Sequence, residues 1–70
     1  MTTLVKVRVN GEPRAVASNM TVQTLLLELG ALRDGVAVAL NDQIVLRSTW
    51  ANTPLHEEDS VEVLSAAPGG

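Results

Sequence analysis

The chain ends in two glycines, Gly69 and Gly70, and this pair is the strongest indication of chemistry in the sequence. Glycine has no Cβ atom, so a backbone that ends in it can pass through a narrow channel and take angles that other residues avoid. The final carboxylate also has no side chain beside it. We therefore expect the C-terminus to be a reactive group that another protein uses. The alternative is an end without a role, because the last residues of many domains are poorly ordered.

The remaining polar residues form no recognisable catalytic set. Ser48 and Ser65 have no histidine at a spacing typical of nucleophilic catalysis. The chain has no cysteine, which excludes a thiol nucleophile, a disulfide and a Cys-ligated metal site. His56 precedes the acidic run 57–59, which lacks the spacing of a calcium loop. We predict no catalytic residue and no metal site in the chain, and a solvated turn around His56.

Length and composition define the class of protein. Seventy residues make one small domain, and 46% apolar and 19% charged residues fit a globular fold. A net charge of −3 without a basic cluster argues against nucleic-acid binding, which depends on grouped Lys and Arg. No apolar run has the length of a membrane span, and the first residues lack the pattern of a signal peptide. We therefore expect a cytoplasmic protein that binds neither nucleic acid nor membrane.

Alternating apolar residues predict the first two strands of the domain that carries the C-terminal diglycine. The alternation over 4–9 is typical of a half-buried strand, and a return strand is predicted over 13–17. Asn10-Gly11 between them is the strongest short signal for a hairpin turn. Pro13 lacks a backbone N–H, which indicates that the return strand lies at a sheet edge.

A single main helix is predicted next. Thr21 is suited to the N-cap, and Gly30 is suited to the left-handed position that ends a helix. Leu27 lies off the apolar side and is expected to be partly exposed. The apolar stripe consists of Val22, Leu25, Leu26 and Leu29.

The second half predicts three more strands, over 36–40, 43–46 and 60–66. A tight turn at 41–42 joins the first two, and a short helical turn carries Trp50. A sole Trp in a small domain favours a plug at the edge of the core over an exposed partner contact. One helix can cover one face of such a sheet, and the chain end leaves from a central strand if the first and last strands are neighbours.

This element order with a terminal Gly-Gly resembles the α+β, ubiquitin-like β-grasp fold, a mixed sheet of about five strands with one main helix on one face. We therefore expect a β-grasp domain over 1–66 and a flexible tail over 67–70. The sequence also resembles the ThiS family, the sulfur carriers of thiamin biosynthesis, and its length fits ThiS better than the related MoaD family. The stretches that carry this resemblance are Val36-Ala-Val-Ala-Leu-Asn41, Ile44-Val45, Arg47-Ser48, Trp50-Ala51 and Val61-Glu-Val63. The departures from the family pattern are Leu46, where proline is expected, and Pro68 before the glycines.

The resemblance implies a specific chemistry at the C-terminus. In a ThiS-like carrier, a ThiF-like adenylyltransferase would adenylate the carboxylate of Gly70, and sulfur would convert it to a thiocarboxylate. Gly69 and Pro68 would enter the partner's active site, and a ThiG-like thiazole synthase would receive the sulfur. ATP belongs to the activating enzyme, so the chain is expected to be a protein co-substrate, not an enzyme, with no cofactor of its own.

Strand alternation predicts a docking surface on the sheet face away from the helix. Small residues beside a large apolar one make a flat surface suited to a protein partner, so we expect docking at Leu64, Ala37 and Ala39. Leu64 lies nearest the tail. The alternative is an ordinary sheet face with isolated apolar residues. The residues predicted on this face are Lys6, Arg8, Ala37, Ala39, Glu62 and Leu64, with Lys6 or Arg8 pairing with Glu62.

Three functions are compatible with the sequence. The first is a sulfur carrier for thiazole formation. The second is a carrier for molybdopterin or another sulfur-containing metabolite, or a protein modifier joined to lysines through Gly70. The third is a passive protein-binding module in which the diglycine is incidental.

Overall fold

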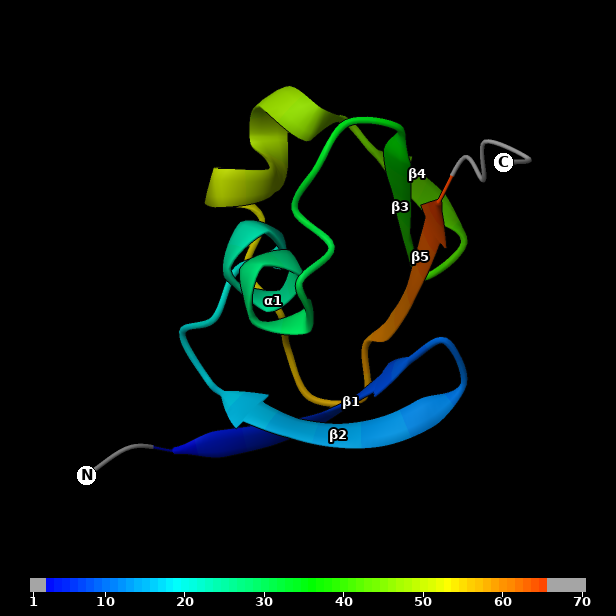
Figure 1. Cartoon of the computed structure of the whole chain (residues 1–70). Helices are drawn as coiled ribbons and strands as arrows, with labels where there is room; N and C mark the ends of the chain where they lie inside the picture. Colours follow the sequence, from blue (N-terminus) through cyan, green and yellow to red (C-terminus); the bar gives the residue numbers. More distant parts are fainter. Residues whose placement is uncertain (1–2, 66–70) are drawn as a thin grey trace.

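The sheet has five strands in the order β2-β1-β5-β3-β4, and one α-helix covers one of its faces. The structure, a computed structural model, describes residues 3–65. Figure 1 shows α1 lying across the curved sheet, with β1 and β2 on one side of it and β3, β4 and β5 on another. This is the mixed sheet with one main helix that the sequence predicts. The elements are β1 (Leu4–Val9), β2 (Glu12–Ala17), α1 (Val22–Leu29), β3 (Val36–Leu40), β4 (Gln43–Val45), the 3₁₀-helix η1 (Arg47–Asn52) and β5 (Ser60–Ser65).

The last strand, β5, is the central strand of the sheet. It runs parallel to β1, where Val9 lies opposite Val61, and antiparallel to β3, where Val36 lies opposite Ser65. β2 lies at one edge, as the proline near its start predicts. The strand that leads toward the C-terminus is therefore held from both sides, which confirms the expected neighbourhood of the first and last strands.

Both predicted hairpin turns are present. Asn10 and Gly11 have φ of 52° and 86°, and Asn41 and Asp42 have φ of 51° and 70°. Two successive residues with positive φ make the type I′ turn, whose twist matches that of the flanking strands. Asparagine and aspartate tolerate this left-handed region better than other residues with a side chain.

The ends of α1 also agree with the sequence. Thr21 caps the helix, because its Oγ1 accepts a hydrogen bond from the backbone N–H of Thr24 at 3.3 Å. Gly30 adopts φ 72° and its N–H donates to the carbonyls of Leu26 and Leu27, which ends the helix. Leu26 is fully buried whereas Leu27 is 64% exposed, so the apolar stripe faces the sheet as predicted.

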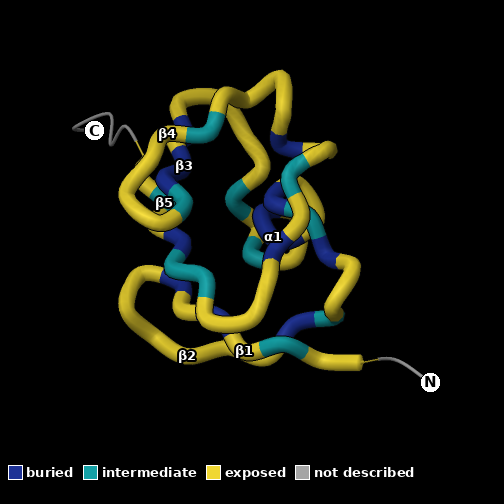
Figure 2. Tube along the Cα trace, turned by 180° about the vertical axis from the view of Figure 1, so that it is seen from behind, coloured by how far each residue is buried: buried dark blue, intermediate teal, exposed yellow. Residues whose placement is uncertain are grey.

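The core lies between α1 and the inner face of the sheet. In Figure 2 the connecting turns at the periphery are exposed, whereas buried segments occur on α1 and on the strands that face it. Trp50 is 2% exposed, and its Nε1–H donates to the carbonyl of Val45 at 2.9 Å, which confirms a structural role for this residue. The core cluster consists of Val7, Val9, Val16, Met20, Val22, Leu25, Leu26, Val36, Val38, Trp50, Leu55 and Val61.

The structure differs from the sequence prediction in a few boundaries. β4 ends at Val45, not at residue 46, because Leu46 begins the turn into η1. The loop after η1 is partly ordered by an isolated bridge between Pro54 and Thr21. Ala66, predicted as the end of the last strand, lies outside the described residues. Within residues 3–65, no helix has the length and hydropathy needed to span a bilayer.

Candidate functional site

The register of β3, β4 and β5 places the predicted docking residues side by side. Ala37 lies opposite Leu64 on β5, and directly opposed residues of an antiparallel pair project to the same face. Leu46 directly follows β4 with extended backbone angles, so it continues the alternation of that strand and projects to the same face as Ile44. Leu64 is 56% exposed and Leu46 is 66% exposed. Large exposed apolar groups therefore lie on this face, and the exposed Ala37 lies beside Leu64.

A cross-strand row centred on Ala39 lies on the same face. Ala39 lies between Ile44 on β4 and Glu62 on β5. Ile44 is 66% exposed, so it adds a large apolar group that the sequence prediction omitted. A three-residue strand is too short for its alternation to show which face it presents. We name Ala37, Ile44, Leu46 and Leu64 the outer patch.

The prediction that Ala39 lies at the surface is wrong. Only 8% of this residue is exposed, although it projects to the outer face. The reason is steric, because its methyl group is short and the longer side chains of Ile44 and Glu62 flank it. A docking role for Ala39 remains a prediction, and its contact area with a partner is small.

The predicted pairing of Lys6 or Arg8 with Glu62 is also wrong. In the described part of the chain, the ion pairs join Arg14 to Glu28 and His56 to Asp59. β1 pairs with β5 only near Arg8, so Glu62 lies past the end of β1 and Lys6 lies before the start of β5. The backbone N–H of Lys6 instead donates to Glu57 Oε1 at 3.1 Å.

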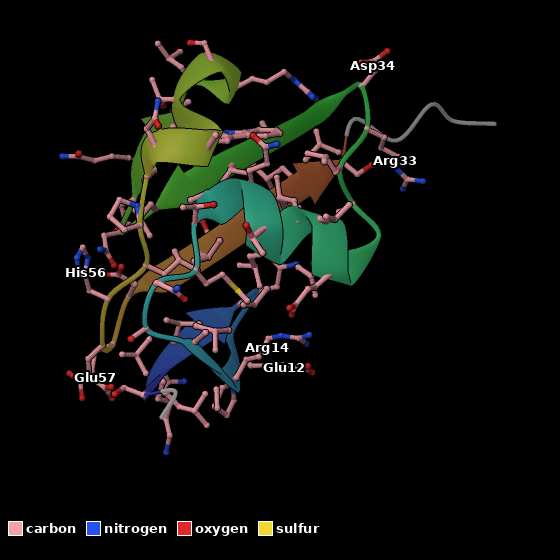
Figure 3. All side chains as sticks on the ribbon, turned by 90° about the vertical axis from the view of Figure 1, so that its left-hand side faces the viewer. Glu12, Arg14, Arg33, Asp34, His56 and Glu57 are labelled. Carbon is pink, nitrogen blue, oxygen red and sulfur yellow. The ribbon has the colours of Figure 1, made fainter. Side chains whose placement is uncertain are left out.

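His56 lies in a solvated turn, as predicted. Its side chain is 74% exposed, with Nδ1 at 3.8 Å from Asp59 Oδ2. The backbone N–H of His56 donates to the same carboxylate oxygen at 2.7 Å, so Asp59 closes the turn. Figure 3 shows His56 and Glu57 on the opposite side of α1 from Arg33 and Asp34. No group of three His, Cys, Asp or Glu side chains placed to hold a metal ion occurs among residues 3–65.

Two asparagines predicted only as turn residues contact the central strand. Asn10 Oδ1 accepts a hydrogen bond from the N–H of Val63 at 2.8 Å. Asn41 Oδ1 accepts one from the N–H of Ser60 at 2.9 Å. Sequence reasoning had no signal for these contacts, since the partners lie 53 and 19 residues apart.

Gly70, Gly69 and Pro68 lie outside the residues that the structure describes, as does the predicted boundary of the tail over 67–70. The described chain ends on β5 at Ser65, one residue after Leu64. Leu64 is thus the residue of the outer patch that lies on the central strand, and it precedes the diglycine most closely in the sequence.

The model of the ThiS family matches residues 7–70 of the chain. The chain belongs to the ThiS family. The sulfur carrier protein ThiS of Thermus thermophilus is 39% identical over 61 residues, which cover 87% of this chain and 94% of that protein. The crystal structure of ThiS, a thiamine biosynthesis protein from Geobacter metallireducens, matches with a TM-score of 0.80 and 32% identity, covering 94% of this chain and 100% of that one. The resemblance to ThiS and the β-grasp fold are both confirmed.

A thiazole synthase of Magnetococcus marinus also contains a ThiS-like segment. It is 37% identical over 65 residues, which cover 93% of this chain. The chain spans only 20% of the length of that relative. A sequence similar to this ThiS family member is therefore part of a longer polypeptide named for thiazole formation.

Proposed function

We propose that this chain is the sulfur carrier for thiazole formation in thiamin biosynthesis and that the carboxylate of Gly70 carries the sulfur. The observation that carries the proposal is the ThiS family match over residues 7–70, because the match includes the diglycine. The fold supports it, since in the sequence the diglycine follows β5, the central strand of the five-stranded sheet.

The proposed chemistry makes a poor electrophile reactive in two steps. A carboxylate oxygen of Gly70 attacks the α-phosphorus of ATP on a ThiF-like enzyme, and pyrophosphate leaves. A persulfide sulfur then attacks the carbonyl carbon of the acyl adenylate, and AMP leaves. Attack of a thiol on the resulting S–S bond forms a disulfide and releases the thiocarboxylate. The chain acts as a co-substrate that carries the reactive group at Gly70. The need for ATP fits a cytoplasmic location.

The outer patch is the proposed docking surface for the partner proteins. Leu64 lies one residue before the end of β5, so a partner seated on this patch lies beside the start of the sequence that leads to Gly70. Exposed apolar side chains around a small central residue suit a flat, desolvated contact. Ala37 supplies the small central residue, the almost fully covered Ala39 adds little contact area, and Leu64 supplies the anchor nearest the terminus in the sequence.

The thiazole synthase relative supports a ThiG-like partner. In the Magnetococcus marinus thiazole synthase, the ThiS-like segment is joined covalently to the rest of the polypeptide. A covalent link raises the effective concentration of two modules that act on one another. We propose that a separate thiazole synthase binds this chain after sulfur loading, and that a ThiF-like adenylyltransferase binds it before.

Intact-mass spectrometry tests the proposal directly. The chain is incubated with a ThiF-like enzyme, ATP and a sulfur donor, and the expected product has one carboxylate oxygen replaced by sulfur. A matched variant with one alanine added after Gly70 is expected to stay unmodified. An unchanged mass of the chain, while a control carrier reacts, would contradict sulfur loading. Conjugates of higher mass would instead identify a protein modifier.

A further inference from the structure

Hydrogen bonding to one side of β5 continues beyond the end of β1. β1 ends at Val9, yet the backbone N–H of Asn10 donates to the carbonyl of Val61 at 2.8 Å. The side-chain Oδ1 of Asn10 then accepts from the N–H of Val63, also at 2.8 Å. In a parallel pair of strands, the N–H of a residue donates to the carbonyl of the residue before its partner. Its own carbonyl accepts from the N–H of the residue after its partner. Asn10 therefore occupies the ladder position opposite Glu62, with Oδ1 in place of its own carbonyl oxygen.

The turn geometry explains this substitution. At φ 52°, Asn10 has already left the strand conformation and entered the type I′ turn, so its own carbonyl no longer follows the ladder. The side-chain amide of asparagine has the same acceptor as a backbone peptide group. Glycine and aspartate also suit this turn position, but glycine has no acceptor to offer.

On the other side of β5, Asn41 also bonds to the strand through both its backbone N–H and its side-chain oxygen. Its N–H donates to the carbonyl of Ser60 at 2.8 Å, and its Oδ1 accepts from the Ser60 N–H at 2.9 Å. It too has a positive φ, 51°, at the first position of a hairpin turn. The central strand is thus held by one asparagine at its start and by another at Val63, two residues before its end.

We propose that Asn10 is a positioning residue for the sulfur-carrying terminus, an inference that rests on the proposed function. Without Oδ1, the half-buried Val63 loses its hydrogen bond, and the last residues of β5 are paired with β3 alone. The end of β5, at Leu64 and Ser65, is then held less firmly in the sheet. Fewer molecules present the C-terminus correctly, which raises the apparent KM for the carrier without changing the chemical step.

Three variants separate this role from a general effect on stability. Asn10→Gly keeps the turn and removes the acceptor, whereas Asn10→Asp keeps both. Asn41→Gly is the control at the far end of the same strand, because it removes the same kind of bond to Ser60. It also removes the bond from Asn41 Nδ2–H to Asp59 Oδ1 at 3.0 Å, so it is at least as disruptive as Asn10→Gly. Circular dichroism verifies that each variant folds.

Amide hydrogen exchange tests the structural part without any partner enzyme. In Asn10→Gly, the Val63 amide is expected to exchange about three to ten times faster relative to Val38, the range for loss of one hydrogen bond. Asn10→Asp is expected to match the parent chain. In Asn41→Gly, faster exchange is expected at Ser60 and not at Val63. Unchanged exchange at Val63 in Asn10→Gly would overturn the proposal.

Steady-state adenylation by a ThiF-like enzyme tests the functional part. Asn10→Gly is expected to raise the KM for the carrier about three- to tenfold at constant kcat, while Asn10→Asp and Asn41→Gly keep the parent KM. If the KM rises equally in Asn41→Gly, Asn10 acts only by stabilising the strand, and its positioning role is overturned. If the parent chain is not adenylated at all, the proposed function fails, and hydrogen exchange still reports on the Asn10 contact.

Discussion

The guanidinium of Arg47 lies over the indole ring of Trp50, with its Cζ atom 4.5 Å from the ring centroid. The same guanidinium donates to the carbonyl of Arg33 at 2.6 Å, and Trp50 Nε1–H donates to the carbonyl of Val45. These contacts tie η1 to β4 and to the loop before β3. The Arg and Trp that contribute to the ThiS resemblance therefore have a structural role in this chain.

Replacing Arg47 by alanine is expected to lower the free energy of unfolding by about 1–2 kcal/mol, the sum of a cation–π contact and a hydrogen bond. Arg47→Lys is expected to recover only part of the loss. The planar guanidinium can stack on the indole ring and donate a hydrogen bond at its edge, whereas an ammonium group has no plane to stack. Urea unfolding followed by Trp50 fluorescence measures both. Equal stability of the parent chain and Arg47→Ala would refute this role.

Replacing Leu64 by glutamate is expected to weaken binding to a ThiF-like or ThiG-like partner about tenfold or more, because a charge would be buried in the outer patch. Leu27→Glu is the control, since Leu27 is 64% exposed on α1 and Leu64 is 56% exposed on the sheet. Titration calorimetry with each partner gives the affinities. The docking surface is misplaced if Leu64→Glu binds as tightly as Leu27→Glu.

Replacing Leu46 by proline, the residue expected there from the ThiS resemblance, is expected to stabilise the fold by about 0.4–1 kcal/mol. The backbone there has φ −65° and ψ 140°, the angles that proline requires. Leu46 also lies one residue past the end of β4, outside the residues of β4 that pair with β3. Leu46→Ala controls for the lost leucine side chain. A lower thermal midpoint for the proline variant than for the alanine variant would contradict this expectation.

Replacing Gly30 by alanine is expected to destabilise the fold by about 1–2 kcal/mol, the cost of a left-handed conformation for a residue with a Cβ atom. An added Cβ would meet no heavy atom within 4 Å, so the cost arises from φ 72° and not from a clash. Gly30→Asn is expected to lose less, since asparagine tolerates this region. Equal losses for both variants in chemical denaturation would show that the backbone angle is not the cause.

Features that depend on neighbouring residues were predictable from the sequence. Asn10-Gly11 makes its hairpin, and Thr21 and Gly30 bound α1, because each needs only the chemistry of a few consecutive residues. The ThiS resemblance was likewise visible in the order of residues, and the family match extends over both glycines, on which the proposed sulfur loading depends.

Features that depend on strand register required the tertiary structure. Ala39 is covered because β3 happens to place it between Ile44 and Glu62. The contact of Asn10 with Val63 joins residues 53 positions apart. A strand pattern repeats every two residues, so it shows which side chains share a face of one strand and not which residue of another strand lies beside them. That choice is made only when the strands pack together around α1.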